Sequence, residues 1–131
     1  MAITANAAAL NAILDSGLDA LFNNGTLDIR SGTAAGAGSA AGGASLCPIT
    51  LPADCLAAAS GGAKAKAGTW SGSGVAAANA SHFRFTGSGG AVIEGSVTAT
   101  GGGGDMTIDN VSIAVSPGVT VSGFTFSRAA A

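Results

Sequence analysis

The sequence has very little charge and few aromatic side chains. Of its 131 residues, 9% are charged and 5% are aromatic, and there is no tyrosine. The five Lys and Arg residues are scattered and the net charge is −2, whereas binding to a polyanion needs clustered cations that displace counterions. We therefore expect neither nucleic acid nor an anionic membrane surface as a partner.

Motifs for catalysis and metal binding are also missing. A single His excludes a histidine pair, and no Ser stands in a G-x-S-x-G motif. Glu94 is the only Glu, and no Asp stands out as its partner in a pair of catalytic carboxylates. We therefore predict no enzyme, with no catalytic, metal-binding or cofactor-binding residues and no cofactor.

Long hydrophobic runs are absent as well. No stretch reaches the roughly 18 apolar residues of a membrane span. The first 21 residues have no Lys or Arg and contain two Asp, which is not typical of a signal peptide. We therefore expect synthesis in a cytoplasm and no membrane partner.

The two cysteines, Cys47 and Cys55, lie eight residues apart and leave two readings open. Both can be small buried hydrophobic residues. They can also form a disulfide that closes a short loop, which the sequence alone does not decide.

The N-terminal segment, residues 1–25, has the pattern of an amphipathic helix over residues 4–22. Its apolar stripe consists of Leu10, Leu14, Leu18 and Leu21. Asp15 and Asp19 are predicted on the other side of the helix. The stripe can pack on the rest of the chain or on another subunit, and both readings stay open.

Residues 26–131 are predicted to form a β-domain, because short alternating segments follow one another between Gly-rich turns. About eight short strands with no helix between them indicate a mainly β fold, an antiparallel β-sandwich of jelly-roll or Ig-like type. A bulge is expected at Gly123, where the alternation changes phase. Residues 31–45 contain almost only Gly, Ala, Ser and Thr and are predicted to be a flexible surface loop. The expected strands cover residues 26–30, 46–51, 63–70, 81–86, 91–100, 106–109, 111–115 and 119–126.

Three further residues are candidates for partner contact. Trp70 shares its parity with two lysines on its predicted strand, so it is either a core residue or an exposed anchor for a partner. His82 and Arg84 share the outward face of another strand. They form either a solvated polar face or a contact patch for another subunit.

The chain resembles small proteins encoded among the structural genes of tailed bacteriophages. The likeness extends over about residues 26–128. It departs from the usual pattern at Cys47 and Cys55, where small or apolar residues are more common. The matching segments are LDIRSGT (27–33), ITLPAD (49–54), AKAKAGTW (63–70), HFRF (82–85), EGSVT (94–98) and the closing residues 119–127.

The resemblance implies a β-sandwich virion protein that is made in the cytoplasm of the bacterial host. The expected function is that of a capsid decoration or cement protein bound to the lattice of the major capsid protein or to other virion proteins. A homo-oligomer is expected, with a trimer favoured, because repeated weak contacts add up on a symmetric particle. The alternatives are a tail or neck component and a surface- or glycan-binding β-sandwich module.

Overall fold

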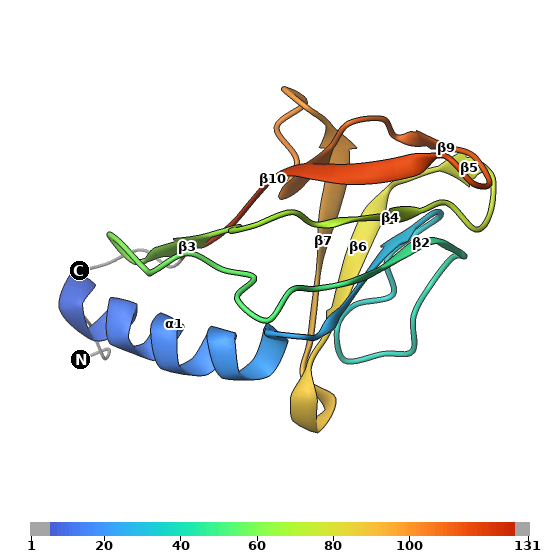
Figure 1. Cartoon of the computed structure of the whole chain (residues 1–131). Coiled ribbons are helices and arrows are strands. Elements are labelled where there is room, and N and C mark those ends of the chain that lie inside the picture. Colours follow the sequence, from blue (N-terminus) through green and yellow to red (C-terminus); the bar gives the residue numbers. More distant parts are fainter. Residues whose placement is uncertain (1–5, 128–131) are drawn as a thin grey trace.

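The computed structural model describes residues 6–127, apart from the side chain of Leu10. One helix, α1 (Ala7–Phe22), precedes a β-rich body (Figure 1). Ten strands follow: β1 (Thr26–Arg30), β2 (Ser45–Thr50), β3 (Ala63–Ala65), β4 (Ser71–Ser73), β5 (Ala78–Asn79), β6 (His82–Thr86), β7 (Val92–Ala99), β8 (Met106–Ile108), β9 (Ser112–Ile113) and β10 (Gly118–Ser127). The predicted mainly β fold with an N-terminal helix is therefore confirmed.

Most strands belong to one curled sheet with the order β2-β1-β6-β7-β8-β10-β3, and β4 pairs with β10 outside this path. A second, two-stranded sheet pairs β5 with β9. The pairing is not antiparallel throughout, because β7 and β8 run parallel. The arrangement is sandwich-like but not closed, since β7 and β10 diverge beyond the short β8 (Figure 1).

Several elements follow directly from local sequence. Strand β1 covers the predicted residues 26–30, and β2 lies at the end of the sheet, where Pro48 costs no ladder hydrogen bond. The register of β10 against β8 shifts between Val121 and Gly123, which confirms the predicted bulge. The strand predicted over residues 63–70 is shorter, because β3 ends at Ala65.

The core is built around aromatic rings. Phe85 lies at its centre, with ring centroids 5.1 to 5.6 Å from those of its four neighbours Phe22, Trp70, Phe83 and Phe124. Such separations favour tilted and edge-to-face contacts. Because Phe22 is the last residue of α1, the helix shares this core with the sheet.

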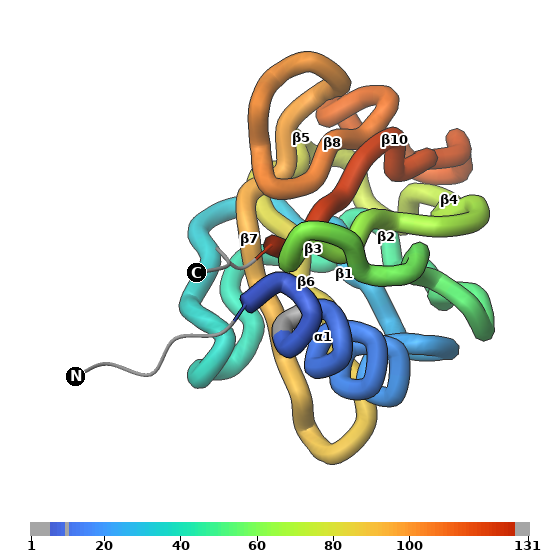
Figure 2. The backbone as a smooth tube through the Cα atoms, turned by 90° about the vertical axis from the view of Figure 1, so that its left-hand side faces the viewer, coloured from blue at the N-terminus to red at the C-terminus, as the bar shows by residue number. Residues whose placement is uncertain are grey.

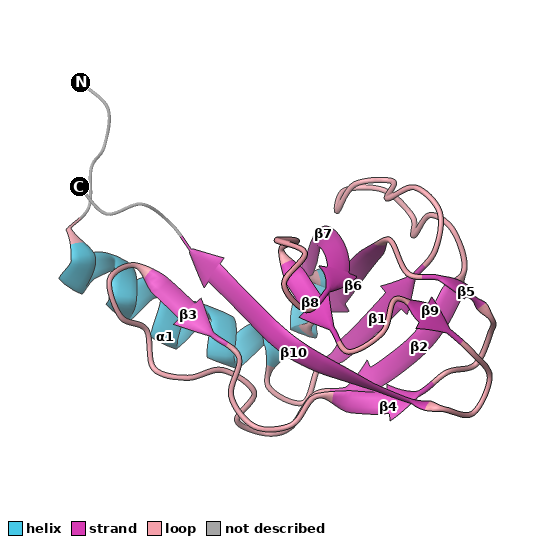
Figure 3. Cartoon of the chain, turned by 90° about the horizontal axis from the view of Figure 1, so that it is seen from above, coloured by secondary structure: helices cyan, strands magenta, loops and turns pink. Residues whose placement is uncertain are grey.

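Helix α1 lies alongside β3 and the end of β10 (Figure 3). The β6–β7 hairpin, with the short helix η1 (Ser88–Gly90) at its tip, lies beside the other end of α1 (Figures 1 and 2). The Ser88 hydroxyl donates a hydrogen bond of 3.3 Å to the Ala20 carbonyl there. The helix is thus held along its length by the β-body.

Candidate functional site

Helix α1 has well-defined ends. The Asn6 side chain accepts a hydrogen bond of 3.0 Å from the Ala9 N–H, as an N-cap residue does. The chain leaves the helix at Asn23, and Asn24 adopts a left-handed backbone conformation with φ of 60°. The predicted end of the helix at residue 22 is therefore confirmed, while the predicted start at residue 4 lies outside the described residues.

One face of α1 packs on the body of the same chain. Leu14 and Phe22 are buried, and Leu18 packs against the core beside them. Leu21, predicted on the same stripe, is 36% exposed, and the side chain of Leu10 lies outside the described part of the chain. Of the two readings left open for the stripe, packing within the chain accounts for Leu14 and Leu18.

The inward face of α1 also carries the carboxylates, contrary to the prediction that Asp15 and Asp19 lie on the other side. Lys64 on β3 has no exposed side-chain surface, and its Nζ lies 2.6 Å from Asp15 Oδ1 and 3.3 Å from Asp19 Oδ1. The Ala57 carbonyl accepts a third contact at 2.7 Å. A lysine buried in the β-body turns both acids toward it, because an unpaired buried charge is very costly.

These contacts shift the pKa values of the partners. Burial alone lowers the pKa of Lys64, but the hydrogen bond to Asp15 and the ion pair with Asp19 outweigh it and raise the pKa above its usual value. The hydrogen bond from Lys64, together with one from the Ala59 N–H, lowers the pKa of Asp15. Both groups are therefore charged at neutral pH.

The outward face of α1 is exposed and carries no charge. Ile13 is 63% exposed, and Gly17 lies one turn further along, where an added Cβ would meet no atom within 4 Å. A surface helix ordinarily places its charged residues on this side. We call this set the outer face of α1: Ala8, Ala9, Ala12, Ile13, Ser16, Gly17, Ala20 and Leu21.

Trp70 is a core residue and presents no surface to a partner, which corrects its assignment as a contact. Its side chain is fully buried, and Nε1–H donates to the carbonyls of Cys55 and Ala67 at 3.2 and 3.1 Å. Lys64, which shares its parity with Trp70, is buried as well, so the face predicted to be polar from the two lysines is not a solvent face.

His82 and Arg84 lie on the outward face of β6 but are not open to solvent. His82 is 3% exposed. Arg84 pairs with Glu94 at 2.5 Å and donates to the Ser39 carbonyl at 2.8 Å. His82 therefore offers no contact surface, and Arg84 is largely engaged within the chain.

The segment that covers this face is the Gly- and Ala-rich loop, residues 31–44. Arg30 donates to the carbonyls of Gly42 and Gly43, and Glu94 accepts from the Gly36 N–H. The loop is attached through its main chain to charged side chains of the sheet. Its predicted flexibility stays a prediction.

Ser81 and His82 are hydrogen-bonded but do not form a nucleophile and base. The Ser81 hydroxyl lies 2.5 Å from the Gly32 carbonyl and 3.0 Å from His82 Nδ1. A carbonyl only accepts, so the hydroxyl proton goes to Gly32 and Nδ1 must be the donor to Ser81. This arrangement holds the serine proton away from the imidazole.

Cys47 and Cys55 are free thiols, and both are buried. The possible disulfide is therefore not formed. Cys55 Sγ lies 3.2 Å from Asn23 Oδ1, just after α1. Burial raises the pKa of both thiols, so each is protonated at neutral pH.

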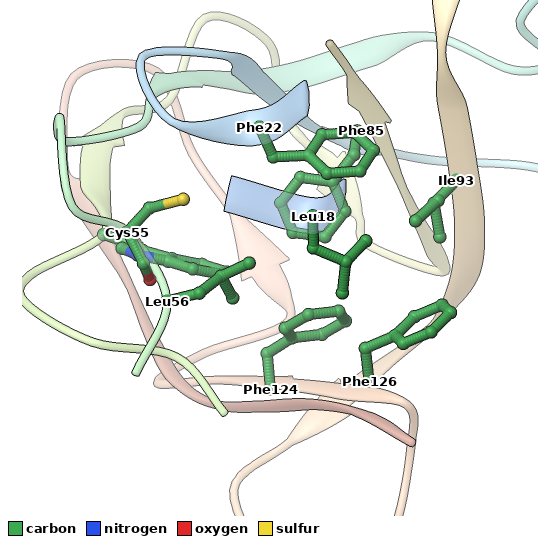
Figure 4. A pocket seen from close by; sticks show the side chains of 9 residues that line it. Leu18, Phe22, Cys55, Leu56, Phe85, Ile93, Phe124 and Phe126 are labelled. Carbon is green, nitrogen blue, oxygen red and sulfur yellow. The ribbon is translucent and has the colours of Figure 1, made fainter. Parts of the chain in front are cut away.

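The apolar pocket between α1 and the sheet is too small for a ligand. Its volume is about 10 Å³, roughly one water molecule, and its walls are the core side chains around Leu18, Phe85 and Phe126 (Figure 4). Within residues 6–127, no three His, Cys, Asp or Glu side chains gather as metal ligands. In the same part of the chain, no helix is both long and apolar enough for a membrane span.

The candidate functional site is therefore the outer face of α1, an exposed helix surface without a charged side chain. Sequence reasoning missed Ile13 and Gly17, because it assigned the side of α1 opposite the leucines to the two acids. The sequence holds no local signal for this, because the acids turn inward to contact Lys64, which lies 49 residues from Asp15. No protein-family model, curated protein or solved structure matches this chain.

Proposed function

We propose that the protein is a non-enzymatic structural component of a tailed-phage virion, a decoration or cement protein that binds the lattice of the major capsid protein. The observation that carries the proposal is the outer face of α1, which is exposed over four turns without a charged side chain. When another protein covers such a face, no charged side chain has to be removed from water, so the free-energy cost of desolvating a charge is absent.

The size of this face fits a multivalent role. A helix of 16 residues is about 24 Å long and, at roughly 10 Å width, offers about 240 Å². This is well below the roughly 800 Å² that each partner of a stable pair buries. One contact is therefore weak, and binding gains strength when several copies, as in a trimer, engage a symmetric lattice together.

The test is co-sedimentation of the purified protein with capsids of its phage that were assembled without it. We expect saturation at a copy number that matches capsid symmetry, and about tenfold weaker binding of an Ile13→Lys variant, because one buried apolar contact is replaced by a charge. The control is Val115→Lys, which changes another exposed apolar residue, 59% exposed, away from α1.

Each outcome has a defined meaning. Absence of binding to capsids would overturn the decoration role, and recovery of six to twelve copies per virion would indicate a neck or tail component. Equal loss of binding in both lysine variants would remove the outer face of α1 from the proposal. For the glycan-binding alternative, Trp70 offers no stacking surface because it lies in the core, and the loop of residues 101–104 is the part of that alternative left to test.

A further inference from the structure

The sheet is incomplete between β7 and β10. Strand β8 has three residues and pairs with β7 only from Val97 to Ala99. The preceding half of β7, residues 92–96, pairs with β6 on one side, and no described strand pairs with its other side. An eight-residue strand inside the sheet therefore has an open edge along more than half of its length.

Along β7, the main-chain groups of successive residues point alternately to the two sides of the strand, which identifies the groups on this edge. Val97 N–H donates to Ser81 on the β6 side, whereas Thr100 N–H donates to Ile108 on the β8 side. Even-numbered residues of β7 thus turn their N–H and C=O groups toward β8 and the open edge. Val92 and Glu94 face the open edge in this way, and Ser96 N–H is bonded at 2.9 Å to the Asp105 carboxylate.

Strand β10 forms the other wall of the gap. Lys66 N–H donates to the Phe124 carbonyl, so Thr125 and Ser127 turn their main-chain groups away from β3 and toward the gap. Figures 1 and 3 show that β7 and β10 separate from each other beyond β8. The edge of β7 therefore offers unpaired main-chain groups to a single added strand, and β10 bounds the space on the other side.

The groove between these walls has a volume of about 260 Å³. Its apolar lining comes from core side chains that reach the gap, and its polar lining includes residues Asp105 and Glu94. Glu94 is neutralised by Arg84, and Asp105 has no cation partner among the described residues. The lining residues are Phe83, Ile93, Glu94, Gly95, Asp105, Phe124, Thr125, Phe126 and Ser127.

We propose that this groove binds an extended segment of a partner protein, which adds to the open edge of β7 in line with β8. Unpaired main-chain groups recognise another main chain, and the apolar lining selects alternating apolar side chains, as in other cases of β-strand addition. Asp105, whose carboxylate has no cation partner among the described residues, favours a Lys or Arg at the end of the segment. The inference rests on the proposed function, because the segment belongs to the virion protein that this chain binds.

A second copy of this chain fits the groove less well. Within residues 6–127, each cationic side chain has a partner in its own chain, and Lys66, whose partner is an uncharged carbonyl, lies within residues 63–67, which have no large apolar side chain for the groove. These partners are Asp28 for Arg30, Asp15 and Asp19 for Lys64, the Gly68 carbonyl for Lys66, and Glu94 for Arg84.

The experiment titrates the ¹⁵N-labelled protein with the peptide Ac-Lys-Thr-Val-Thr-Val-Thr-NH₂. We expect shifts and slower hydrogen exchange at the amides of Val92 and Glu94. The same peptide with proline in place of its central threonine should not bind, because it loses a main-chain donor. A Val92→Pro variant should bind about fivefold more weakly, since one hydrogen bond is lost while the odd-numbered bonds to β6 stay.

A second variant separates charge from pairing. Asp105→Asn keeps an acceptor for Ser96 N–H and should weaken only the peptide that carries lysine, and not a version with valine in its place. Unchanged β7 amides at saturating peptide would overturn the inference, as would shifts confined to Thr125 and Ser127. Because capsids take no part in this titration, its failure is distinct from failure of the co-sedimentation experiment.

Discussion

Lys64 carries its charge on a side chain with no exposed surface. Asp15 and Asp19 remain partly exposed, so the pair lies at the boundary between α1 and the body and not deep in the core. The lysine is the partner that needs compensation, because it has no access to water while the acids do.

Replacement of Lys64 by methionine tests how much the buried charge and its two acidic partners contribute to stability. The variant keeps the volume of the stem and leaves two acids that can reach water, so we expect a loss of only about 1 kcal/mol in the free energy of unfolding at neutral pH. Urea denaturation of the variant and the native protein measures the difference.

The ion pair between Lys64 and Asp15 predicts that stability depends on pH. The folded pKa of Asp15 is below the usual 3.8, so its contribution is complete above about pH 4 and is lost as pH falls through the lowered value. The folded pKa of Lys64 is above 10.5, so its contribution is complete below that pH and is lost as pH rises through the raised value. The difference between native protein and Lys64→Met should shrink in acid. A constant difference from neutral to acid pH would contradict the ion pair.

Cys47 and Cys55 should be unreactive in the folded protein. Burial raises the pKa of both thiols, which leaves little thiolate, and it also blocks access. We expect no alkylation by iodoacetamide at neutral pH and double alkylation in guanidinium chloride, both followed by intact mass. Rapid labelling of the folded chain at one cysteine would place that residue at the surface.

At the scale of elements, α1 is bound on one side by apolar and acidic residues together. Leu14 and Leu18 alternate with Asp15 and Asp19 on the inward face, so the carboxylates that usually solvate a surface helix are used inside. The stability of the helix therefore depends on β3. The outer face does not need charged residues to hold the helix in place, and it has none.

Gly17 lies on the outer face of α1, where contacts within the chain do not restrict the residue type. The fold of the single chain does not require a glycine there, and Gly17→Ala should raise the free energy of unfolding by about 1 kcal/mol through helix propensity. Thermal and urea denaturation measure the gain. If a partner approaches the outer face closely, the same substitution should weaken capsid binding.

Gly43→Ala is the matched control. Gly43 has φ of 67°, and a Cβ there would collide with the Ser31 carbonyl, so this substitution should destabilise the loop attachment. Similar effects of the two substitutions would show that Gly17 is also held by contacts within the chain.

For the whole molecule, helix and sheet share one core. Phe22 from α1 and Trp70 from the β-body both pack against Phe85. Far-ultraviolet circular dichroism and the fluorescence of the single tryptophan should therefore change over the same range of urea. Loss of helical signal at lower urea than the tryptophan change would show that α1 unfolds separately from the body.

The sequence by itself determined the local elements. The leucine spacing predicts α1, alternation predicts β1, β6 and β7, and the change of phase at Gly123 locates the bulge in β10. These features depend on residues within a few positions of each other, through helical or strand periodicity and turn chemistry.

Only the tertiary structure decided which polar side chains are buried and where the sheet stays open. Lys64 is buried because α1 brings Asp15 and Asp19 over it, and His82 is buried because residues 31–44 run across β6. The parallel pairing of β7 with β8 follows from the path of the connection, residues 100–105, and the open edge beyond it follows from the course of the more distant β10. The physical reason is that periodicity assigns a residue to a face, whereas its burial depends on which remote part of the chain covers that face.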